Sequence, residues 1–207
     1  DAISDMTIGQ SNELWLAGQN HVSAFYTEFH QIQAHHLHQH TQNKVNSASN
    51  SSLTPHNLFH DTQGALWMAA LEDKTGQVSL QRLDEYGKLH KVANLKGKSP
   101  RRPIIQFNGY IFVGAQNNEL WLLSPQTGNK EMVITLPGPA TESNRAVHLH
   151  ATGGRLWVLT ATGKVYTLSN PEAALELHPI NQYIPEGGLY NSMLIDPLGN
   201  IWLAGQG

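Results

Sequence analysis

The residues of this chain best suited to chemistry are histidines that stand two positions apart or in a dense cluster. His148 and His150 alternate in the stretch AVHLHA, and alternate residues of a β-strand point to the same face of a sheet. Two imidazoles on one face can act as a proton relay or contact a ligand, or they can be held by structural hydrogen bonds. His60, in the apolar segment HNLFHD, allows the same two interpretations.

A histidine-rich tract occupies residues 30–57, and it holds the weak candidate metal ligands His35, His36, His38 and His40. Imidazoles at this density can bind Zn²⁺, Ni²⁺ or Cu²⁺. A metal site also needs fixed ligand geometry and outer-shell partners, which a run of Asn, Ser and Gln does not supply. We therefore interpret the tract as a low-complexity insertion, and we predict no bound metal and no other cofactor.

Composition narrows the function classes. The 207 residues carry a net charge of -3 and include no cysteine, and 40% of them are hydrophobic. This charge balance predicts neither nucleic-acid binding nor direct membrane insertion, and the absence of cysteine excludes disulfides and Cys-based zinc sites. No apolar run is long enough to cross a bilayer. Because the chain begins at Asp1 without Met or a leader, we expect it to be a segment of a longer protein.

Common catalytic motifs are missing from the sequence. It has no Gly-x-Ser-x-Gly elbow, no His-Glu-x-x-His helix and no phosphate-binding loop. The carboxylates are scattered, and the pairs Glu72–Asp73 and Asp84–Glu85 fall in expected hairpin loops. Acid/base catalysis by residues from distant parts of the chain stays open, but no pattern in the sequence supports it.

An aromatic residue recurs at a nearly fixed step along the chain. It follows a turn in the phrases SNELWLAG, TQGALWMAA, FNGYIFVGA, GGRLWVLT and LGNIWLAG, which place Trp15, Trp67, Phe112, Trp157 and Trp202. The first step is 52 residues and each later step is 45, and the tract 30–57 accounts for the longer one. A period near 45 is typical of propellers and arrays.

Each unit contains four short segments rich in β-branched and aromatic residues and bounded by Gly, Asn, Asp or Pro. Four short antiparallel strands of this kind describe one propeller blade. Gly and Pro interrupt any helical periodicity, and a β-sandwich does not explain the constant step. We predict an all-β fold of the β-propeller class, with four units and a half unit over residues 1–207. The half unit is either continued in a longer chain or completed by the N-terminal strands.

The repeated aromatic has a structural explanation. A lone four-stranded sheet leaves both faces uncovered, so blades must stack, and a large flat side chain fills the wedge between two blades. The phrases Asp61 to Gly64 and Asp196 to Gly199 share the pattern Asp-x-x-Gly. In both, we predict that the Asp side chain caps the turn and fixes the first hairpin of the unit.

A polar position recurs eleven or twelve residues before each aromatic, where a loop leads into the first strand of the unit. It holds Ser4, His56, Arg101, Arg145 and Asn191, with Arg102, Asn144 and Tyr190 beside them. Such loops form one rim of a propeller, and converging arginines suit carboxylate or phosphate groups. These residues other than Ser4, together with His148 and His150, are the predicted ligand-binding set. The alternative is that they are solvated loop residues.

The phrase apolar-x-x-Asp-x-x-Gly-Asn-Ile/Leu-Trp-Leu-Ala/Gly resembles the two-component regulator propeller repeat. MLIDPLGNIWLAGQG is the best copy and LFHDTQGALWMAAL is close, whereas the unit of Phe112 lacks both the Asp and the Trp. The sequence is also similar, more weakly, to streptogramin lyase, another propeller with a Gly-Asn-Leu-Trp repeat. The first resemblance implies a periplasmic sensor domain, which in that family precedes a transmembrane helix and an output module, and it implies no catalytic residues.

The repeat and the resemblance leave three alternative functions. The first is a periplasmic or extracellular sensing or interaction propeller of a bacterial signal-transduction protein, which binds a small molecule, a glycan or a protein at the rim and could dimerise at full length. The second is a propeller lyase or glycan-active enzyme that uses rim His and Arg residues. The third is a scaffold subunit of an envelope complex. Fold alone does not choose among them.

Overall fold

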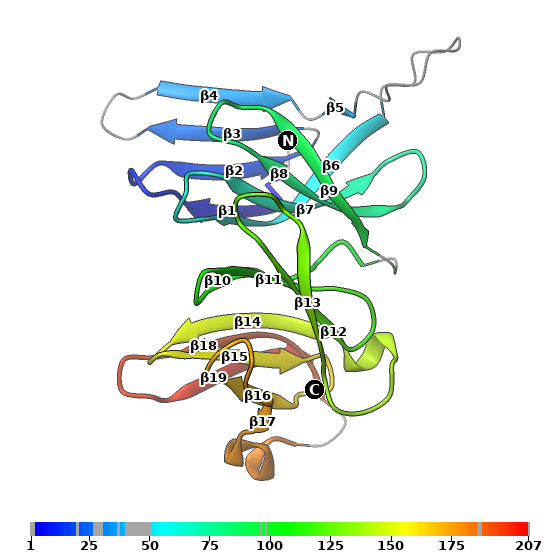
Figure 1. Ribbon diagram of the computed structural model, residues 1–207, viewed down its shortest axis with the longest axis vertical. Helices are drawn as coiled ribbons and strands as arrows, with labels where there is room; N and C mark the ends of the chain where they lie inside the picture. Colours follow the sequence, from blue (N-terminus) through cyan, green and yellow to red (C-terminus); the bar gives the residue numbers. More distant parts are fainter. Residues whose placement is uncertain are drawn as a thin grey trace. The chain divides into compact units, whose positions relative to one another are not determined.

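Antiparallel strands make up most of the structure, a computed structural model that describes residues 3–19, 21–26, 31–36, 38–39, 51–95, 97, 99–185 and 188–206. Figure 1 labels the strands along the chain. The chain divides into two units, residues 1–101 and 102–207, and each unit is described by itself.

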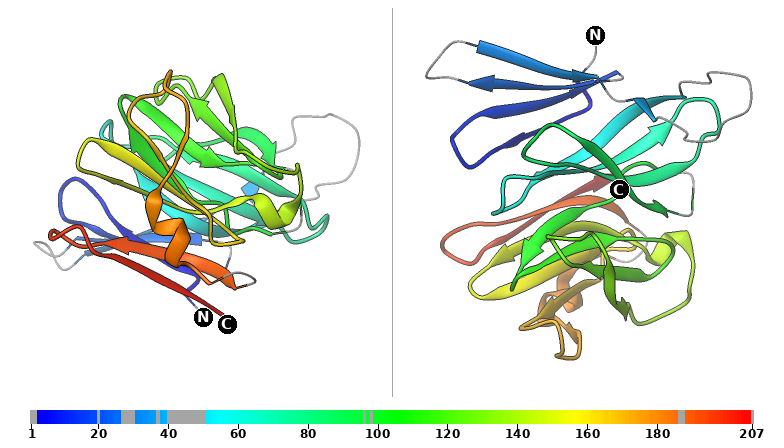
Figure 2. Two further views of the ribbon diagram at one scale, coloured as in Figure 1. Left: turned by 90° about the horizontal axis from the view of Figure 1, so that it is seen from below. Right: turned by 45° about the horizontal axis from the view of Figure 1, so that its top comes forward.

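Unit 1 contains two blades. The first is a sheet in the order β1 (Asp5–Ile8), β2 (Leu14–Gly18), β3 (His21–Tyr26) and β4 (Gln31–His36). The second follows the order β6 (Ser51–His60), β7 (Leu66–Glu72), β8 (Val78–Leu83) and β9 (Leu89–Leu95), and the short β5 (His38–Gln39) pairs with the start of β6. The first strands of the two blades, β1 and β6, lie side by side. Figure 2 shows the blue first sheet followed by the cyan-to-green second sheet.

Unit 2 contains two further blades and a hairpin. The third blade is β10 (Ile104–Phe107), β11 (Tyr110–Gly114), β12 (Glu119–Leu123) and β13 (Lys130–Thr135). The fourth blade is β14 (Ala146–Thr152), β15 (Arg155–Thr160), β16 (Val165–Leu168) and β17 (Glu176–Leu177). The hairpin is β18 (Leu189–Ile195) and β19 (Ile201–Gln206), and two 3-10 helices, Glu142–Asn144 and Pro179–Tyr183, precede β14 and β18. Strand β14 lies beside both β10 and β18.

The strand order identifies the architecture. In each of the four blades every strand pairs with the next one along the chain, and the first strands of successive blades within a unit are neighbours. This is the arrangement of propeller blades, whose first strands line a common axis. The predicted all-β propeller class is therefore confirmed.

The histidine-rich tract overlaps regular strands at both of its ends. Gln31–His36 forms β4, His38–Gln39 forms β5, and the last residues of the tract belong to β6, which starts at Ser51. Residues 40–50 lie outside the described residues. The described residues near both ends of the insertion predicted over residues 30–57 therefore belong to strands of the sheets of unit 1.

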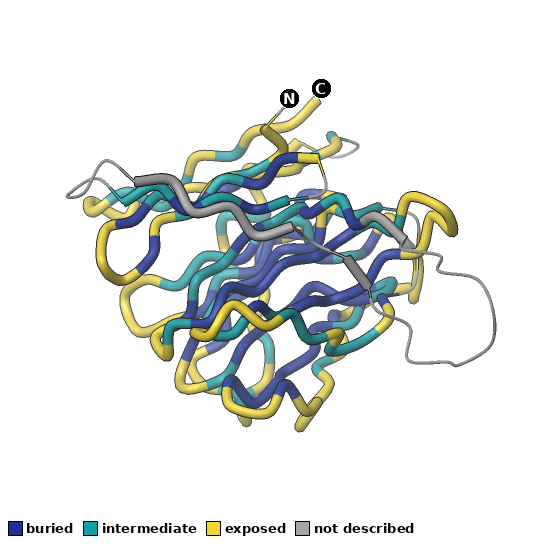
Figure 3. The backbone as a smooth tube through the Cα atoms, turned by 90° about the horizontal axis from the view of Figure 1, so that it is seen from above, coloured by how far each residue is buried: buried dark blue, intermediate teal, exposed yellow. Residues whose placement is uncertain are grey.

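Apolar cores hold neighbouring blades together within each unit, and the repeated aromatics contribute to them. Trp15 packs in one cluster with Leu58 and Met68 of the second blade. Phe112 packs with Leu149 of the fourth blade. In Figure 3 the buried residues follow the middle of the strands, and the exposed ones gather at the turns.

Trp157 extends the same pattern, and Trp67 is buried as well. Trp157 packs beside a cluster that includes Met193 of β18, and Trp67 is fully buried. The aromatics of the first, third and fourth blades thus contact the blade or hairpin that follows them in their unit. Their predicted role as wedges between blades is confirmed by these contacts.

Trp202 departs from this prediction, because its side chain is 62% exposed. Its neighbour Leu203 pairs with Met193, and both belong to the side of the hairpin that packs on the fourth blade. Because successive residues of a strand alternate between faces, Trp202 points to the opposite side. No blade of unit 2 covers that side among the described residues, and the expectation of a buried wedge is wrong at this position.

The Asp-x-x-Gly phrase builds its turn as predicted. Asp61 Oδ1 accepts hydrogen bonds from the backbone N–H groups of Gln63 and Ala65, at 2.8 and 2.9 Å. Its Oδ2 accepts a third from Trp67 Nε1 at 2.7 Å. Gly64 adopts a φ of +88°, which a residue without a Cβ reaches at little cost. The carboxylate therefore fixes the turn and the tryptophan together.

The same arrangement recurs at two other hairpins. Asp196 accepts from the N–H groups of Leu198 and Asn200, at 3.0 and 2.8 Å, and from Trp202 Nε1 at 3.3 Å. Asp84 accepts from the N–H group of Lys88 in the turn between β8 and β9. Its Oδ2 lies 2.8 Å from His90 Nε2, which takes the place of the indole. The predicted turn-capping role of the Asp residue is confirmed in both phrases for which it was made.

The burial difference between two tryptophans of the repeat gives a matched test. Trp67→Ala removes a fully buried side chain and leaves Asp61 without an indole partner, so it should lower the free energy of unfolding by about 3–5 kcal/mol. Trp202→Ala removes an exposed ring and should change it by about 0.5 kcal/mol or less. Urea unfolding followed by circular dichroism measures both, and equal losses would contradict the assignment of Trp67 as a packing residue.

Candidate functional site

Two predicted rim positions of unit 1 lie close together, Ser4 directly before β1 and His56 in the middle of β6. Ser4 Oγ donates a hydrogen bond to the carbonyl of Pro55 at 2.7 Å, which places Ser4 next to His56. Burial lowers the pKa of His56 below its ordinary value, the positive charge of Arg101 lowers it further, and the charge of Asp5 opposes both. His56 and Arg101 are therefore close enough to interact, and His56 is held in its neutral form.

Two of the rim positions predicted in unit 2 are occupied by local contacts. Arg102 is fully buried, and its Nη1 donates to the carbonyl of Ala115 at 2.6 Å. Asn144 is also buried, and its amide donates to the carbonyls of Pro137 and Pro139, at 3.0 and 3.3 Å. Both side chains hold the loops that lead into their blades, so these groups are already engaged within the unit.

The other rim positions of unit 2 are more accessible. Arg145 is half-buried, and Asn191 is exposed at an irregularity in the pairing of β18. The ring of Tyr190 packs beside the core between the fourth blade and the hairpin, and its hydroxyl donates to the carbonyl of Pro185 at 3.5 Å. Ligand binding by these residues remains a prediction.

His148 and His150 lie on one face of β14, as their spacing predicts. Their rings stack with centroids 6.5 Å apart and planes inclined by 25°. Burial lowers the pKa of both side chains, and the charge of His150 lowers the pKa of His148 further. His150 pairs across the sheet with Trp157, on the side that faces the hairpin β18–β19. The pair is thus at a blade boundary, and its role in binding remains a prediction.

The metal-ligand candidates are placed only in part. His35 and His36 belong to β4 and His38 to β5, of which only the backbone is described, and His40 lies outside the described residues. Among the side chains that the structure does describe, no group of three or more His, Asp or Glu residues could hold a metal ion.

A pocket of about 300 Å³ opens between the two blades of unit 1, where the turns β1–β2, β6–β7 and β8–β9 meet. Glu13, Trp15 and Tyr26 of the first blade line one side, and His60, Glu85 and Tyr86 of the second blade line the other. The volume is at the lower end of the range of small-molecule sites. The pocket lies at the turn ends of the first strands, whereas the predicted rim lies at their opposite ends.

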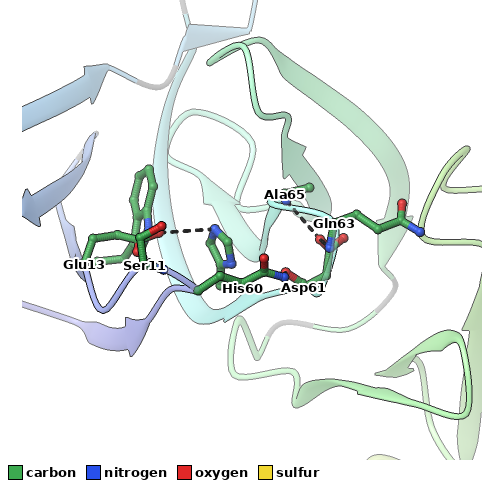
Figure 4. Close-up of polar contacts among 8 residues, drawn as sticks. Ser11, Glu13, His60, Asp61, Gln63 and Ala65 are labelled. Carbon is green, nitrogen blue, oxygen red and sulfur yellow. Dashed lines mark hydrogen bonds and ion pairs between the residues drawn. The ribbon is translucent and has the colours of Figure 1, made fainter.

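A buried acid and a histidine meet at the base of this pocket (Figure 4). Glu13 Oε1 lies 3.6 Å from His60 Nε2, with side chains that are 8% and 6% exposed. Glu13 also accepts hydrogen bonds from Trp15 Nε1 at 3.1 Å and from the N–H of Ser11 at 2.9 Å. The rings of Trp15 and His60 stack with centroids 6.2 Å apart. The contact between Glu13 and His60 thus bridges the two blades.

Most of this pocket was not predicted from the sequence, although two sequence signals pointed to it. Glu13 stands two residues before Trp15, and Glu119 stands two residues before Trp121 and bonds to its indole at 2.8 Å. This spacing marks an acid that pairs with a tryptophan. Asp84, the first residue of the phrase DEYGKLH, repeats the Asp-x-x-Gly pattern and places the β8–β9 turn beside the pocket.

No family model and no curated protein matches the sequence, but solved structures have similar folds. Virginiamycin B lyase from Staphylococcus aureus aligns with a TM-score of 0.70 and 13% identity, over 98% of this chain and 63% of that one. A streptogramin B lyase aligns with a TM-score of 0.64 and 14% identity, over 99% of this chain and 68% of that one.

A second group of similar structures comes from B. thetaiotaomicron. The extracellular domain of BT3049, described as a hybrid two component system, aligns with a TM-score of 0.66 and 12% identity, over 98% of this chain and 26% of that one. The chain thus spans under two thirds of the S. aureus lyase and about a quarter of this domain. The repeat phrase resembles two kinds of protein, two-component regulator propellers and streptogramin lyases, and structures of both kinds have a similar fold. At these identities the similarity shows the fold alone.

The two histidines of β14 give a pH test. Because their pKa values are lower in the folded state than in the unfolded chain, the unfolded chain binds more protons on acidification. Stability contributed by the neutral imidazoles is complete above the unfolded pKa of about 6.5 and is lost as the pH falls towards the folded values.

We therefore expect the melting temperature to fall between about pH 7.5 and pH 5.5, and to fall less in the variant His148→Gln/His150→Gln. His56 and His178, whose pKa values are also lowered by burial, keep part of the slope in that variant. Differential scanning calorimetry at several pH values measures the effect. An unchanged slope in the double variant would refute the burial of these imidazoles.

Proposed function

We propose that the chain is part of a ligand-binding or interaction propeller of a bacterial signal-transduction protein, located outside the cytoplasm. The observation that carries this proposal is the match in fold to extracellular domains described as two component systems, combined with the repeat phrase DPLGNIWLAG. No helix within the described residues is long and apolar enough to cross a membrane.

The proposed contacts of this domain are separate in the two units. In unit 1, His56 of β6 offers a neutral imidazole and Arg101, after β9, offers a guanidinium. An arginine there suits a carboxylate or phosphate group of a ligand. In unit 2, Arg145, His148, His150, Tyr190 and Asn191 offer the corresponding polar groups, and Arg102 and Asn144 position the loops beside them.

Membrane topology tests the location. The full-length gene product, with alkaline phosphatase fused after position 207, should show phosphatase activity in cells, because the enzyme needs disulfides that form outside the cytoplasm. Green fluorescent protein fused at the same point serves as the opposite reporter. Fluorescence together with an inactive phosphatase would place the chain in the cytoplasm and remove the sensor proposal.

Lyase activity is the second candidate, favoured by the TM-score of 0.70 to virginiamycin B lyase. A general base must reach the proton that it removes. His60 and Glu13 pair in a pocket as such a mechanism would need, but both side chains are more than nine-tenths buried and Glu13 already accepts two further hydrogen bonds. We therefore favour binding over catalysis at this pair.

Incubation of the purified chain with virginiamycin B, followed by mass spectrometry, decides between the two candidates. We expect the antibiotic to remain intact, because Glu13 is already held by Ser11, Trp15 and His60 and is not free to remove a proton. The variant His60→Gln is the control for any conversion that is seen. Conversion by the unaltered chain that disappears in this variant would place the lyase function ahead of the sensor function.

A further inference from the structure

The pocket between the two blades of unit 1 has the features of a site for a particular class of ligand. It is formed by three turns of two blades that pack on each other within one unit. Gln10 Nε2 donates to the carbonyl of Asp61 at 3.0 Å and so joins two of these turns. The volume of about 300 Å³ corresponds to roughly ten water-sized groups at about 30 Å³ each. A small organic molecule fits this space.

The lining of the pocket carries negative charge. Three of its residues are carboxylates, Glu13, Asp84 and Glu85, and its lining includes no lysine or arginine among the described residues. Burial acts to raise the pKa of Asp84, but hydrogen bonds from His90 and from the N–H groups of Lys88 and Tyr86 outweigh it and leave that pKa below its ordinary value. Asp84 is therefore ionised at neutral pH. A cation is favoured in the pocket by the combined field of these groups.

The histidine at the base adds a second, independent feature. His60 is 94% buried, and its Nε2 faces Glu13 Oε1. A proton on Nε2 is attracted to that carboxylate, so Nδ1 carries the lone pair. Among the described residues no group donates a hydrogen bond to Nδ1. Nδ1 itself is buried, so the acceptors that the pocket offers to a ligand with N–H donors are its carboxylates.

Aromatic and apolar groups complete the lining. Trp15, Tyr26 and Tyr86 contribute rings, and Leu66 and Leu83 contribute apolar surface. The faces of aromatic rings attract cations, and the leucines suit an apolar ligand body. Tyr86 is 87% exposed, so its ring stands at the mouth of the pocket where a ligand can pack on it.

We propose that this pocket binds a small organic cation, with a primary ammonium group directed at the carboxylates and an apolar body against Trp15 and Tyr26. The proposal deepens the proposed function, because it names the ligand class of a site in the same domain, at the opposite ends of the first strands from the predicted rim. Binding to the purified chain does not depend on cellular location. Failure of the topology test and failure of the binding test are therefore separate outcomes.

Three probes of nearly equal size and different charge test the proposal: benzylammonium, benzyl alcohol and benzoate. Titration of the full 207-residue chain is followed by two-dimensional NMR, with residues of the three turns as reporters. We expect the Kd of benzylammonium to be about tenfold lower than that of benzyl alcohol, and benzoate not to bind. The affinity for benzylammonium should fall when salt is raised to about 0.5 M, because partly exposed carboxylates are screened.

Matched variants locate the binding. Glu85 is exposed, so Glu85→Gln should leave the fold intact and should weaken benzylammonium binding by about two- to fivefold. Glu172→Gln, an equally exposed change in unit 2, should leave the Kd unchanged. Glu13→Gln should weaken binding by about tenfold, and its circular dichroism spectrum reports whether the blades remain folded.

Several results would overturn the proposal. Equal affinities for benzylammonium and benzyl alcohol would mean that charge plays no part, and shifts confined to unit 2 would place the ligand elsewhere. Absence of binding by all three probes at about 20 mM, well above the millimolar range of weak complexes, would mean that the pocket is only a gap between turns. If Glu13→Gln unfolds, the comparison of Glu85→Gln with Glu172→Gln decides the outcome.

Discussion

The need to cover both faces of each sheet is the constraint on which the rest of the structure depends. A four-stranded blade has two apolar faces and cannot be stable alone. In this chain the second strand of each repeat supplies a large aromatic side chain. Where the next blade or hairpin belongs to the same unit, this side chain contacts it. The 45-residue step of the sequence is thus the step at which a new face has to be covered.

Burial of tryptophan creates a second requirement, because the indole N–H loses its contact with water and needs an acceptor. For Trp67 the acceptor is Asp61, which lies six residues upstream and also caps the turn. For Trp15 the acceptor is Glu13, two residues before it in the chain. Phe112 has no N–H and needs no such acceptor. At Trp15 and Trp67 the acid and the tryptophan are therefore one structural device, whereas the buried Nε1 of Trp157 has no hydrogen-bond partner among the described residues.

This device brings charge to the blade boundary of unit 1. Glu13 pairs with an indole as a packing requirement, but its carboxylate also faces His60 of the neighbouring blade. A second acid of the same kind, Asp84, caps the β8–β9 turn beside it. The pocket between the two blades is acidic because the turns that form it are capped by acids. A feature that first serves folding thereby sets the chemistry of a cavity.

The sequence was informative about packing and turn-capping requirements that recur in each blade. It was uninformative about features that occur once. The recurring aromatic and the Asp-x-x-Gly turns predicted the propeller, the wedge positions and the turn caps, since each arises from local or nearest-neighbour packing. Arg102 looked like a rim residue by its spacing, yet it is buried against the carbonyl of Ala115. A single sequence does not tell whether an arginine beside a strand points outward or folds back. The exposure of Trp202 likewise depends on what covers the next face.

The position of the acidic pocket gives ligand binding a direct physical link to blade packing. A ligand that touches Trp15 of the first blade and Glu85 of the second bridges two sheets whose contact is otherwise made by the apolar cluster and by the pair Glu13–His60. Its binding free energy then adds to the free energy that holds these blades together, in proportion to its preference for the packed state. A ligand at the proposed rim site would contact the loops that lead into the first strands and would leave this boundary untouched. Under these two proposals, the two ends of the same strands would bind different molecules.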